Sequence, residues 1–257
     1  MRMTPRAALQ CAALAALLSA SCSGGGLFRQ YEYEEEMYLS LDGSATMYVN
    51  TSLPALMALR GLQLDDLSPR VDRDGIRDYY TAPGVRVTSV TQSRRSGRRF
   101  VHVRLAVDDI RKLGSTKPFA WSTYRFERVG DQFVYRQTVG PPVSGVAGAP
   151  ARAMVVTMQP REAGWNGSEL VAFRLHLPSK IEFHNTRRDI GRGNILVWEQ
   201  TLAERRRGVP LTLEARMQTQ SILYRTLWLF GLTFVVVALL FVAVIWWVLR
   251  RGQPAEA

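Results

Sequence analysis

The chain has 257 residues, of which 33 are Lys or Arg and 22 are Asp or Glu, so its formal net charge is +11. Its two cysteines are too few for a disulfide framework. A chain of this length is ample for one domain with its own hydrophobic core and marginal for two.

The N-terminus has the pattern of a secretory signal peptide, which we predict over residues 1–21. Arg2 and Arg6 form a short basic region, an apolar run follows over residues 7–18, and small residues close the segment. The mature chain is therefore expected to begin outside the cytoplasm. Cys11 leaves with this peptide, so one cysteine remains and no disulfide within the chain is possible.

Cys22, the first residue after the predicted signal peptide, has two interpretations. The run from Leu18 to Cys22 resembles a bacterial lipobox, in which the cysteine becomes the acylated first residue of the mature protein. Ala20 and Ser21 fit that pattern, whereas Ser19 stands where Leu or Val is expected. The alternative is ordinary signal-peptidase cleavage, which leaves the thiol free. We expect acylation, because the small residues before Cys22 fit the lipobox. Two lipid chains are a stable anchor by themselves, so with the C-terminal helix the domain would be anchored at both ends.

Residues 22–224 predict one extracytoplasmic α+β domain, mainly antiparallel sheet with a few short helices. The first half is expected to contain strands at 32–41 and 45–50 around an Asp-Gly turn, a helix capped by Ser52 and ended by Gly61, a helix at 70–80, a hairpin at 85–91 and 100–107, and a short helix at 108–113. The second half is expected to contain a hairpin at 119–128 and 132–138, a loop at 140–150, and strands at 169–177, 181–184, 195–201 and 211–218.

Residues 226–249 carry no formal charge and predict a transmembrane helix, which we assign to 225–249. At about 1.5 Å per residue this run is about 36 Å long, enough to cross a hydrocarbon core of about 30 Å. Trp228 and the pair Trp246–Trp247 stand near its two ends, as interfacial aromatic residues do. The expected topology is a single-pass protein of the bacterial cell membrane with a short cytoplasmic tail at 250–257.

Arginines cluster at the predicted turns, including a group at 205–207. In a domain tethered to a bilayer, such residues face anionic headgroups, where each is worth up to about 1 kcal/mol. The alternative is that these turns are simply solvated. The candidates for headgroup contact are Arg94, Arg95, Arg98, Arg99, Arg187, Arg188 and Arg192.

The sequence offers no constellation of catalytic residues. It has neither the Gly-x-Ser-x-Gly elbow of a hydrolase nor a phosphate-binding loop. His176 and His184 lie eight residues apart around Glu182, but no helical pair or cysteine companion supports a metal site. We therefore expect a protein that is not an enzyme and that has no catalytic residue, metal or cofactor.

A run of carboxylates stands in the first predicted strand. Because side chains alternate along a strand, Glu34 and Glu36 are expected on one face and Glu35 on the other. We interpret the run as part of a solvated edge or loop.

The C-terminal third resembles a known family. A strand ending in Leu-Pro (Phe173–Pro178) is followed by Asn185, a basic turn (Arg187–Asn194), a strand with Trp198, and the terminal apolar helix. This layout resembles the LppM family of bacterial envelope lipoproteins, and residues 99–113 resemble that family's central strand and short helix. The resemblance implies an extracytoplasmic fold similar to lipid-binding modules, a role at lipids or glycolipids, and no established catalytic residue.

These observations predict a non-catalytic, membrane-anchored envelope lipoprotein that binds or shields a lipid or glycolipid at the outer face of the membrane. An apolar cavity would hold the chains, and arginines would contact an anionic headgroup. The alternative is a structural or assembly partner of another envelope membrane protein. Export from the cytoplasm argues against nucleic acid as a partner, and the sequence names no protein partner.

Overall fold

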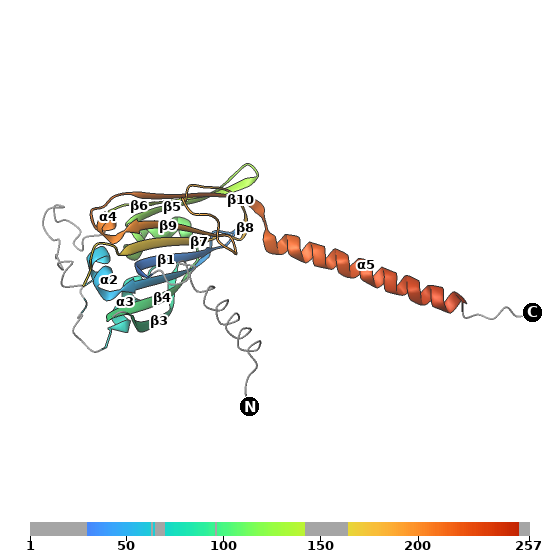
Figure 1. Ribbon diagram of the computed structural model, residues 1–257, viewed down its shortest axis with the longest axis horizontal. Helices are drawn as coiled ribbons and strands as arrows, with labels where there is room; N and C mark the ends of the chain where they lie inside the picture. Colours follow the sequence, from blue (N-terminus) through green and yellow to red (C-terminus); the bar gives the residue numbers. More distant parts are fainter. Residues whose placement is uncertain (1–29, 63, 65–69, 96, 142–163, 252–257) are drawn as a thin grey trace, which may run out of the picture. The chain divides into compact units, whose positions relative to one another are not determined.

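The computed structural model describes residues 30–62, 64, 70–95, 97–141 and 164–251 (Figure 1). The predicted signal peptide, Cys22 and most of the predicted loop at 140–150 lie outside these residues.

The described strands form two sheets, whereas the sequence suggested one. Sheet A has the strand order β3-β4-β2-β1-β7-β9, and sheet B has the order β5-β6-β10-β8. The strands of sheet A are β1 (Tyr31–Leu39), β2 (Ala45–Ser52), β3 (Val85–Arg95), β4 (Arg98–Val107), β7 (Leu170–His176) and β9 (Ile195–Thr201). Those of sheet B are β5 (Ser122–Val129), β6 (Gln132–Val139), β8 (Ser179–His184) and β10 (Leu211–Ser221). The predicted α+β class, rich in antiparallel pairs, is confirmed.

Short helices connect the strands. They are α2 (Leu53–Arg60), α3 (Arg73–Tyr80), α4 (Leu202–Arg206) and the 3-10 turns η1 (Ile110–Ser115) and η2 (Lys117–Phe119). At the start of α2, the Ser52 hydroxyl accepts a hydrogen bond from the Ala55 amide at 3.2 Å, and Gly61 ends the helix with a φ of 65°. Both ends of this helix are as predicted.

Three local features differ from the prediction. A register shift between Val87 and Ser89 breaks the expected alternation in β3. The hairpin of β5 and β6 begins at Ser122 rather than residue 119, because η2 occupies Lys117–Phe119. Helix α4 was not predicted, although Thr201 and Glu204 form a capping box at its start.

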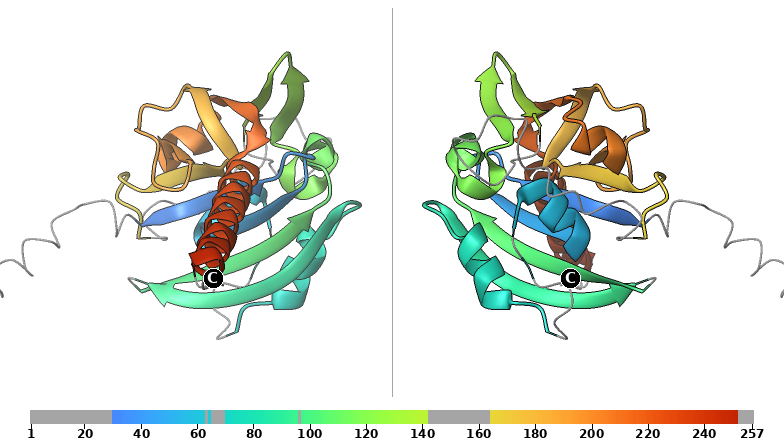
Figure 2. Two further views of the ribbon diagram at one scale, coloured as in Figure 1. Left: turned by 90° about the vertical axis from the view of Figure 1, so that its right-hand side faces the viewer. Right: turned by 90° about the vertical axis from the view of Figure 1, so that its left-hand side faces the viewer.

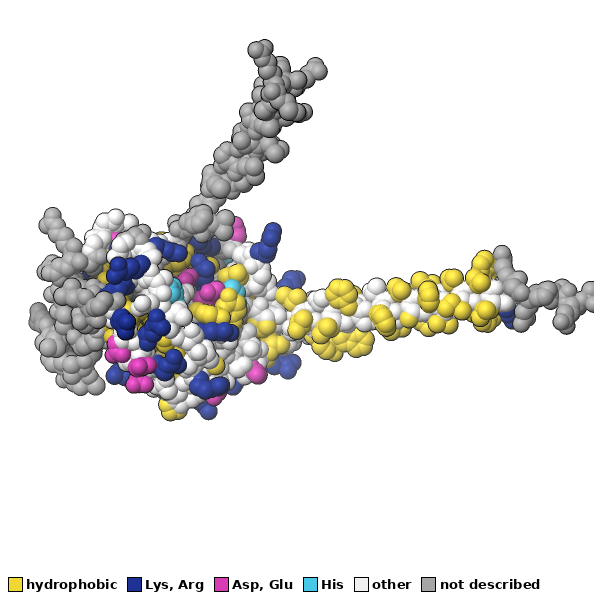
Figure 3. Space-filling view, turned by 90° about the horizontal axis from the view of Figure 1, so that it is seen from below, with side chains coloured by type: hydrophobic (Ala, Val, Ile, Leu, Met, Phe, Trp, Pro, Cys, Tyr) yellow, Lys and Arg dark blue, Asp and Glu magenta, His cyan; other side chains and the backbone are white. Residues whose placement is uncertain are grey.

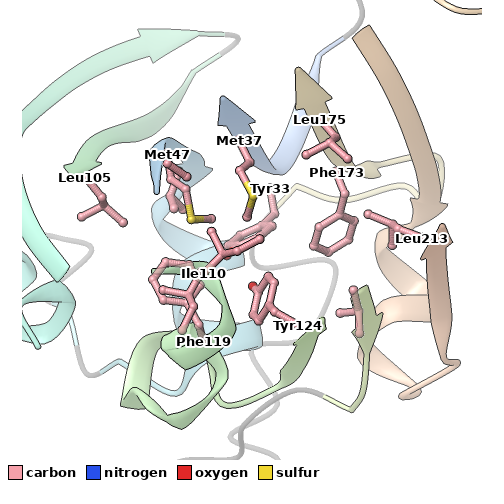
Figure 4. Packing of buried hydrophobic residues seen from close by; sticks show 14 of the residues in the cluster. Tyr33, Met37, Met47, Leu105, Ile110, Phe119, Tyr124, Phe173, Leu175 and Leu213 are labelled. Atoms are coloured by element: carbon pink, nitrogen blue, oxygen red, sulfur yellow. The ribbon is translucent and has the colours of Figure 1, made fainter. Parts of the chain in front are cut away.

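The hydrophobic core lies between the two sheets. Figure 4 shows Phe173 of sheet A pointing toward Leu213 of sheet B, and Tyr33 of sheet A lying beside Tyr124 of sheet B. Each of these four is buried, and full burial of such a side chain contributes about 1.5–3 kcal/mol. Inward-facing apolar residues on alternate positions therefore determine which face of each sheet is covered.

Helix α5 (Ile222–Arg251) begins at the residue after β10. The Ile222 amide donates to the Pro178 carbonyl at 3.1 Å, which holds the junction beside the turn between β7 and β8. The helix is long and apolar enough to cross a membrane. Its apolar side chains are exposed along its length, so none of them belongs to the core of the domain (Figure 3).

Candidate functional site

The first group of predicted arginines lies at the tip of the β3–β4 hairpin. These two strands form the long curved edge of sheet A (Figure 2). Arg94 lies directly opposite Arg99, and Arg95 lies opposite Arg98, an arrangement of like charges that is unfavourable by itself. The repulsion on Arg98 is partly offset, because its guanidinium lies 3.2 Å from the Glu32 carboxylate.

The second group lies in the loop between β8 and β9. Arg187, Arg188 and Arg192 are exposed there, and Arg188 forms an ion pair with Glu199 at 2.7 Å. Because β3 and β9 are the two edge strands of a six-stranded sheet, they lie about 24 Å apart across the sheet. The structure therefore does not bring the two groups together, and Figure 3 shows basic side chains spread over the face in view.

The loop between β8 and β9 returns to the start of α5. The Leu177 amide donates to the Asn194 carbonyl at 3.2 Å, and the Asn194 side chain donates to the Ser179 carbonyl at 2.8 Å. Ser179 in turn pairs with Ser221, the last residue of β10. Arg192, two residues before Asn194, is thus close to the junction between β10 and α5.

Two further cations lie near the same junction. Lys180 follows Ser179 in β8 and is exposed. Exposed Arg128 lies close to the tip of the β5–β6 hairpin, where Gln132 pairs with Gln218 near the end of β10. We call Arg128, Lys180 and Arg192 the junction cations. Of the three, Arg192 alone was predicted as a headgroup contact, because Arg128 and Lys180 are single charges outside any cluster in the sequence.

The outer face of sheet A carries a row of polar side chains that crosses five strands, β3, β4, β2, β1 and β7. The His102 ring nitrogens lie 2.8 Å from the Ser93 hydroxyl and 2.9 Å from the Asn50 side-chain oxygen. The Asn50 amide donates to Glu34 at 3.0 Å, and Glu34 lies 2.9 Å from Arg174. Glu34 is thus partly buried and paired with Arg174 on an interior strand of sheet A, so the predicted solvated edge is wrong for this carboxylate.

A second cluster on the same face surrounds Glu36. This carboxylate lies 2.6 Å from a ring nitrogen of His176 and accepts a hydrogen bond from Tyr38 at 3.1 Å. The rings of Tyr38 and His176 stack with their centroids 3.8 Å apart. The hydrogen bond from His176 holds the pKa of Glu36 below its ordinary value, against the opposing effect of burial.

This lowered pKa predicts a pH dependence. Because the folded-state pKa of Glu36 lies below the unfolded value, its stabilising effect is present above about pH 4.5 and is lost as the pH falls through the folded-state pKa. Glu36→Gln is expected to lower the free energy of unfolding by about 1–2 kcal/mol at pH 6 and to change it little near pH 2. Urea unfolding at both pH values measures this, with exposed Glu127→Gln as the control; an equal loss at both would contradict it.

A third cluster is buried between the sheets. The Arg60 guanidinium lies 2.5 Å from Glu35, donates to the Tyr33 hydroxyl, and stacks 3.5 Å from the centre of the Trp121 ring. Tyr33 donates to Glu35 at 2.6 Å. Burial acts to lower the pKa of Arg60, but Tyr33 and Glu35 outweigh it and raise that pKa. Glu35 lies on the opposite face from Glu34 and Glu36, as alternation predicted, but it is an internal charge rather than part of a solvated edge.

Arg205 also lies near the Trp121 ring, with 5.5 Å between its guanidinium carbon and the ring centre. It is fully buried and donates to Gln200 at 3.2 Å and to the Gly140 carbonyl. The predicted position of Arg205 in a surface turn is therefore wrong. The capping box that begins at Thr201 was the available signal, since it predicts a helix that can turn one of three consecutive arginines inward.

Among the described residues, no group of three or more His, Cys, Asp or Glu side chains is arranged to hold a metal ion. His176 and His184 in particular have different neighbours: His176 contacts Glu36 on sheet A, whereas His184 ends β8 in sheet B.

Comparison with known proteins adds little. No protein-family model matches the chain, and neither does any curated protein sequence. The NMR structure of the folded domain of LppM from Mycobacterium tuberculosis aligns with 75% of this chain and 94% of that domain, at 13% identity and a TM-score of 0.37. A likeness of this size carries no conclusion about function.

Proposed function

We propose that the chain is a non-catalytic, single-pass protein of the bacterial envelope that binds or shields an anionic lipid or glycolipid beside its own membrane anchor. The observation that supports the proposal best is the direct passage from β10 into α5, without a linker. With α5 in a bilayer, the end of β10 and everything hydrogen-bonded to it stay at the membrane surface.

The junction cations supply the attraction. Arg128, Lys180 and Arg192 are exposed and lie on the segments that adjoin the start of α5. A basic side chain near an anionic membrane surface contributes about 1 kcal/mol. The three together therefore favour binding of an anionic headgroup at this end of the domain, whereas Arg94, Arg95 and Arg99 belong to the far edge of sheet A.

Native mass spectrometry of the full-length protein, extracted from membranes in a neutral detergent, tests the proposal. We expect the wild type to retain an anionic lipid. The triple variant Arg128→Gln, Lys180→Gln, Arg192→Gln is expected to bind it on the order of 100-fold more weakly. The matched control changes the same charge at the hairpin tip, Arg94→Gln, Arg95→Gln, Arg99→Gln, and is expected to retain the lipid.

Two results would count against this function. A wild-type protein that carries no lipid contradicts it, and so does an equal loss in both triple variants. Recovery of a stoichiometric protein partner by crosslinking in intact cells, in place of lipid, would favour the assembly role instead.

A further inference from the structure

The buried cluster around Trp121 holds more positive than negative charge. The Arg60 side chain is fully buried, and Arg205 is 0% exposed. Among the described residues, the one carboxylate in contact with either arginine is Glu35, on Arg60. A buried charge without a counter-charge is strongly destabilising, so the second arginine calls for a partner that the neighbouring side chains do not supply.

The same cluster contains hydrogen-bond donors that are buried and unused. They have no acceptor among the residues that the structure describes, and each such group carries a desolvation penalty unless an acceptor is bound. The atoms are Arg60 Nε and Nη1, Arg205 Nε, Trp121 Nε1 and the Tyr80 hydroxyl.

These donors belong to neighbouring side chains. Both guanidinium groups lie against one indole ring, at 3.5 Å and 5.5 Å from its centre. Burial lowers the pKa of Arg205 to about 10, and repulsion from Arg60 acts in the same direction. The chemistry that complements such a cluster is negative and accepts several hydrogen bonds, as carboxylate and phosphate oxygens do beside paired arginines.

We propose that the folded domain binds a small oxyanion, phosphate or carboxylate, between Arg60 and Arg205 at Trp121. This site is distinct from the membrane-facing surface. Arg205 precedes β10, whose 11 residues extend about 36 Å to the start of α5, so the anion comes from solution rather than from the anchoring bilayer. Bound water would satisfy the donors but would leave the excess charge uncompensated.

Thermal unfolding of the full-length protein in neutral detergent tests this site. Sodium phosphate and sodium acetate are titrated against sodium chloride at constant ionic strength. At a hundredfold excess over the dissociation constant, the better of the two anions is expected to raise the melting temperature by about 5–10 °C. Comparison of the phosphate and acetate titrations shows whether the site binds phosphate or carboxylate.

Substitutions at Arg205 and Trp121 test whether the anion binds at this cluster. Arg205→Met is expected to abolish the anion dependence, whereas Arg207→Met, which removes an exposed charge two residues away, is expected to keep it. Trp121→Phe retains a ring for stacking and removes one donor, so it is expected to weaken the dependence even where Arg205→Met fails to fold. The junction triple variant should respond as the wild type does, which separates this site from lipid binding.

A wild-type melting temperature that is the same in phosphate, acetate and chloride would overturn the proposal and leave water as the occupant. An anion effect that persists unchanged in both Arg205→Met and Trp121→Phe would also overturn it, because the anion would then be bound elsewhere.

Discussion

Arg60→Met is expected to reduce the free energy of unfolding by about 3–5 kcal/mol, the largest effect we predict for a single substitution. Arg60 and Glu35 are both buried and 2.5 Å apart, so removal of the arginine leaves an uncompensated carboxylate in the core. It also removes the partner that stacks on Trp121 at 3.5 Å. Urea denaturation of the wild type and the variant at pH 7 measures the loss.

A double variant shows how much of that loss comes from the stranded charge. Arg60→Met with Glu35→Leu replaces both charges by apolar side chains, and buried pairs replaced in this way are often nearly neutral in stability. We expect the double variant to be more stable than Arg60→Met alone. Exposed Arg104→Met is the control and should stay within about 0.5 kcal/mol of the wild type. A double variant as unstable as the single one would show that packing, not charge, dominates.

The second large effect concerns the two predicted anchors. A chain that ends at Ser221 lacks α5, and a Cys22→Ser substitution removes the predicted acylation site. Either change alone is expected to leave the protein in the membrane fraction, because one anchor remains. The two together are expected to release essentially all of it, since the exposed side chains of α5 contribute nothing to the core of the domain.

Carbonate extraction followed by immunoblotting measures this release. Complete release by truncation alone would show that Cys22 is not acylated. Retention of the doubly changed protein would show that neither anchor is required for membrane attachment. Mass spectrometry of the mature N-terminus gives an independent measure of acylation.

Features that depend on residues adjacent in the chain were predicted correctly from the sequence. The Asp-Gly turn between β1 and β2 was predicted because a glycine with positive φ suits a tight hairpin, and Gly43 has a φ of 92°. The cap at Ser52 follows equally local rules. Strand limits were less accurate where a bulge or a 3-10 turn intervened, as in β3 and before β5, because these depend on packing against other elements.

The candidate sites depended far more on tertiary structure. Arg205, Arg206 and Arg207 are consecutive in sequence, yet Arg205 alone is fully buried. The partners of Arg205 come from residues as distant in sequence as Gly140, and Glu35 meets Arg60 across 25 positions. Composition and spacing contain no information about such contacts. The grouping of arginines into apparent clusters was misleading for the same reason, because sequence clusters lie on opposite edges of sheet A.

The sequence by itself determined the α+β class, most strands, the cap of α2 and a C-terminal helix apolar enough to span a membrane, because each depends on local propensity or on the period of apolar residues. Only the tertiary structure decided that there are two sheets, which arginines adjoin the helix, and which two are buried beside Trp121. These follow from strand order and long-range packing, in which residues far apart in the chain exclude water from one another.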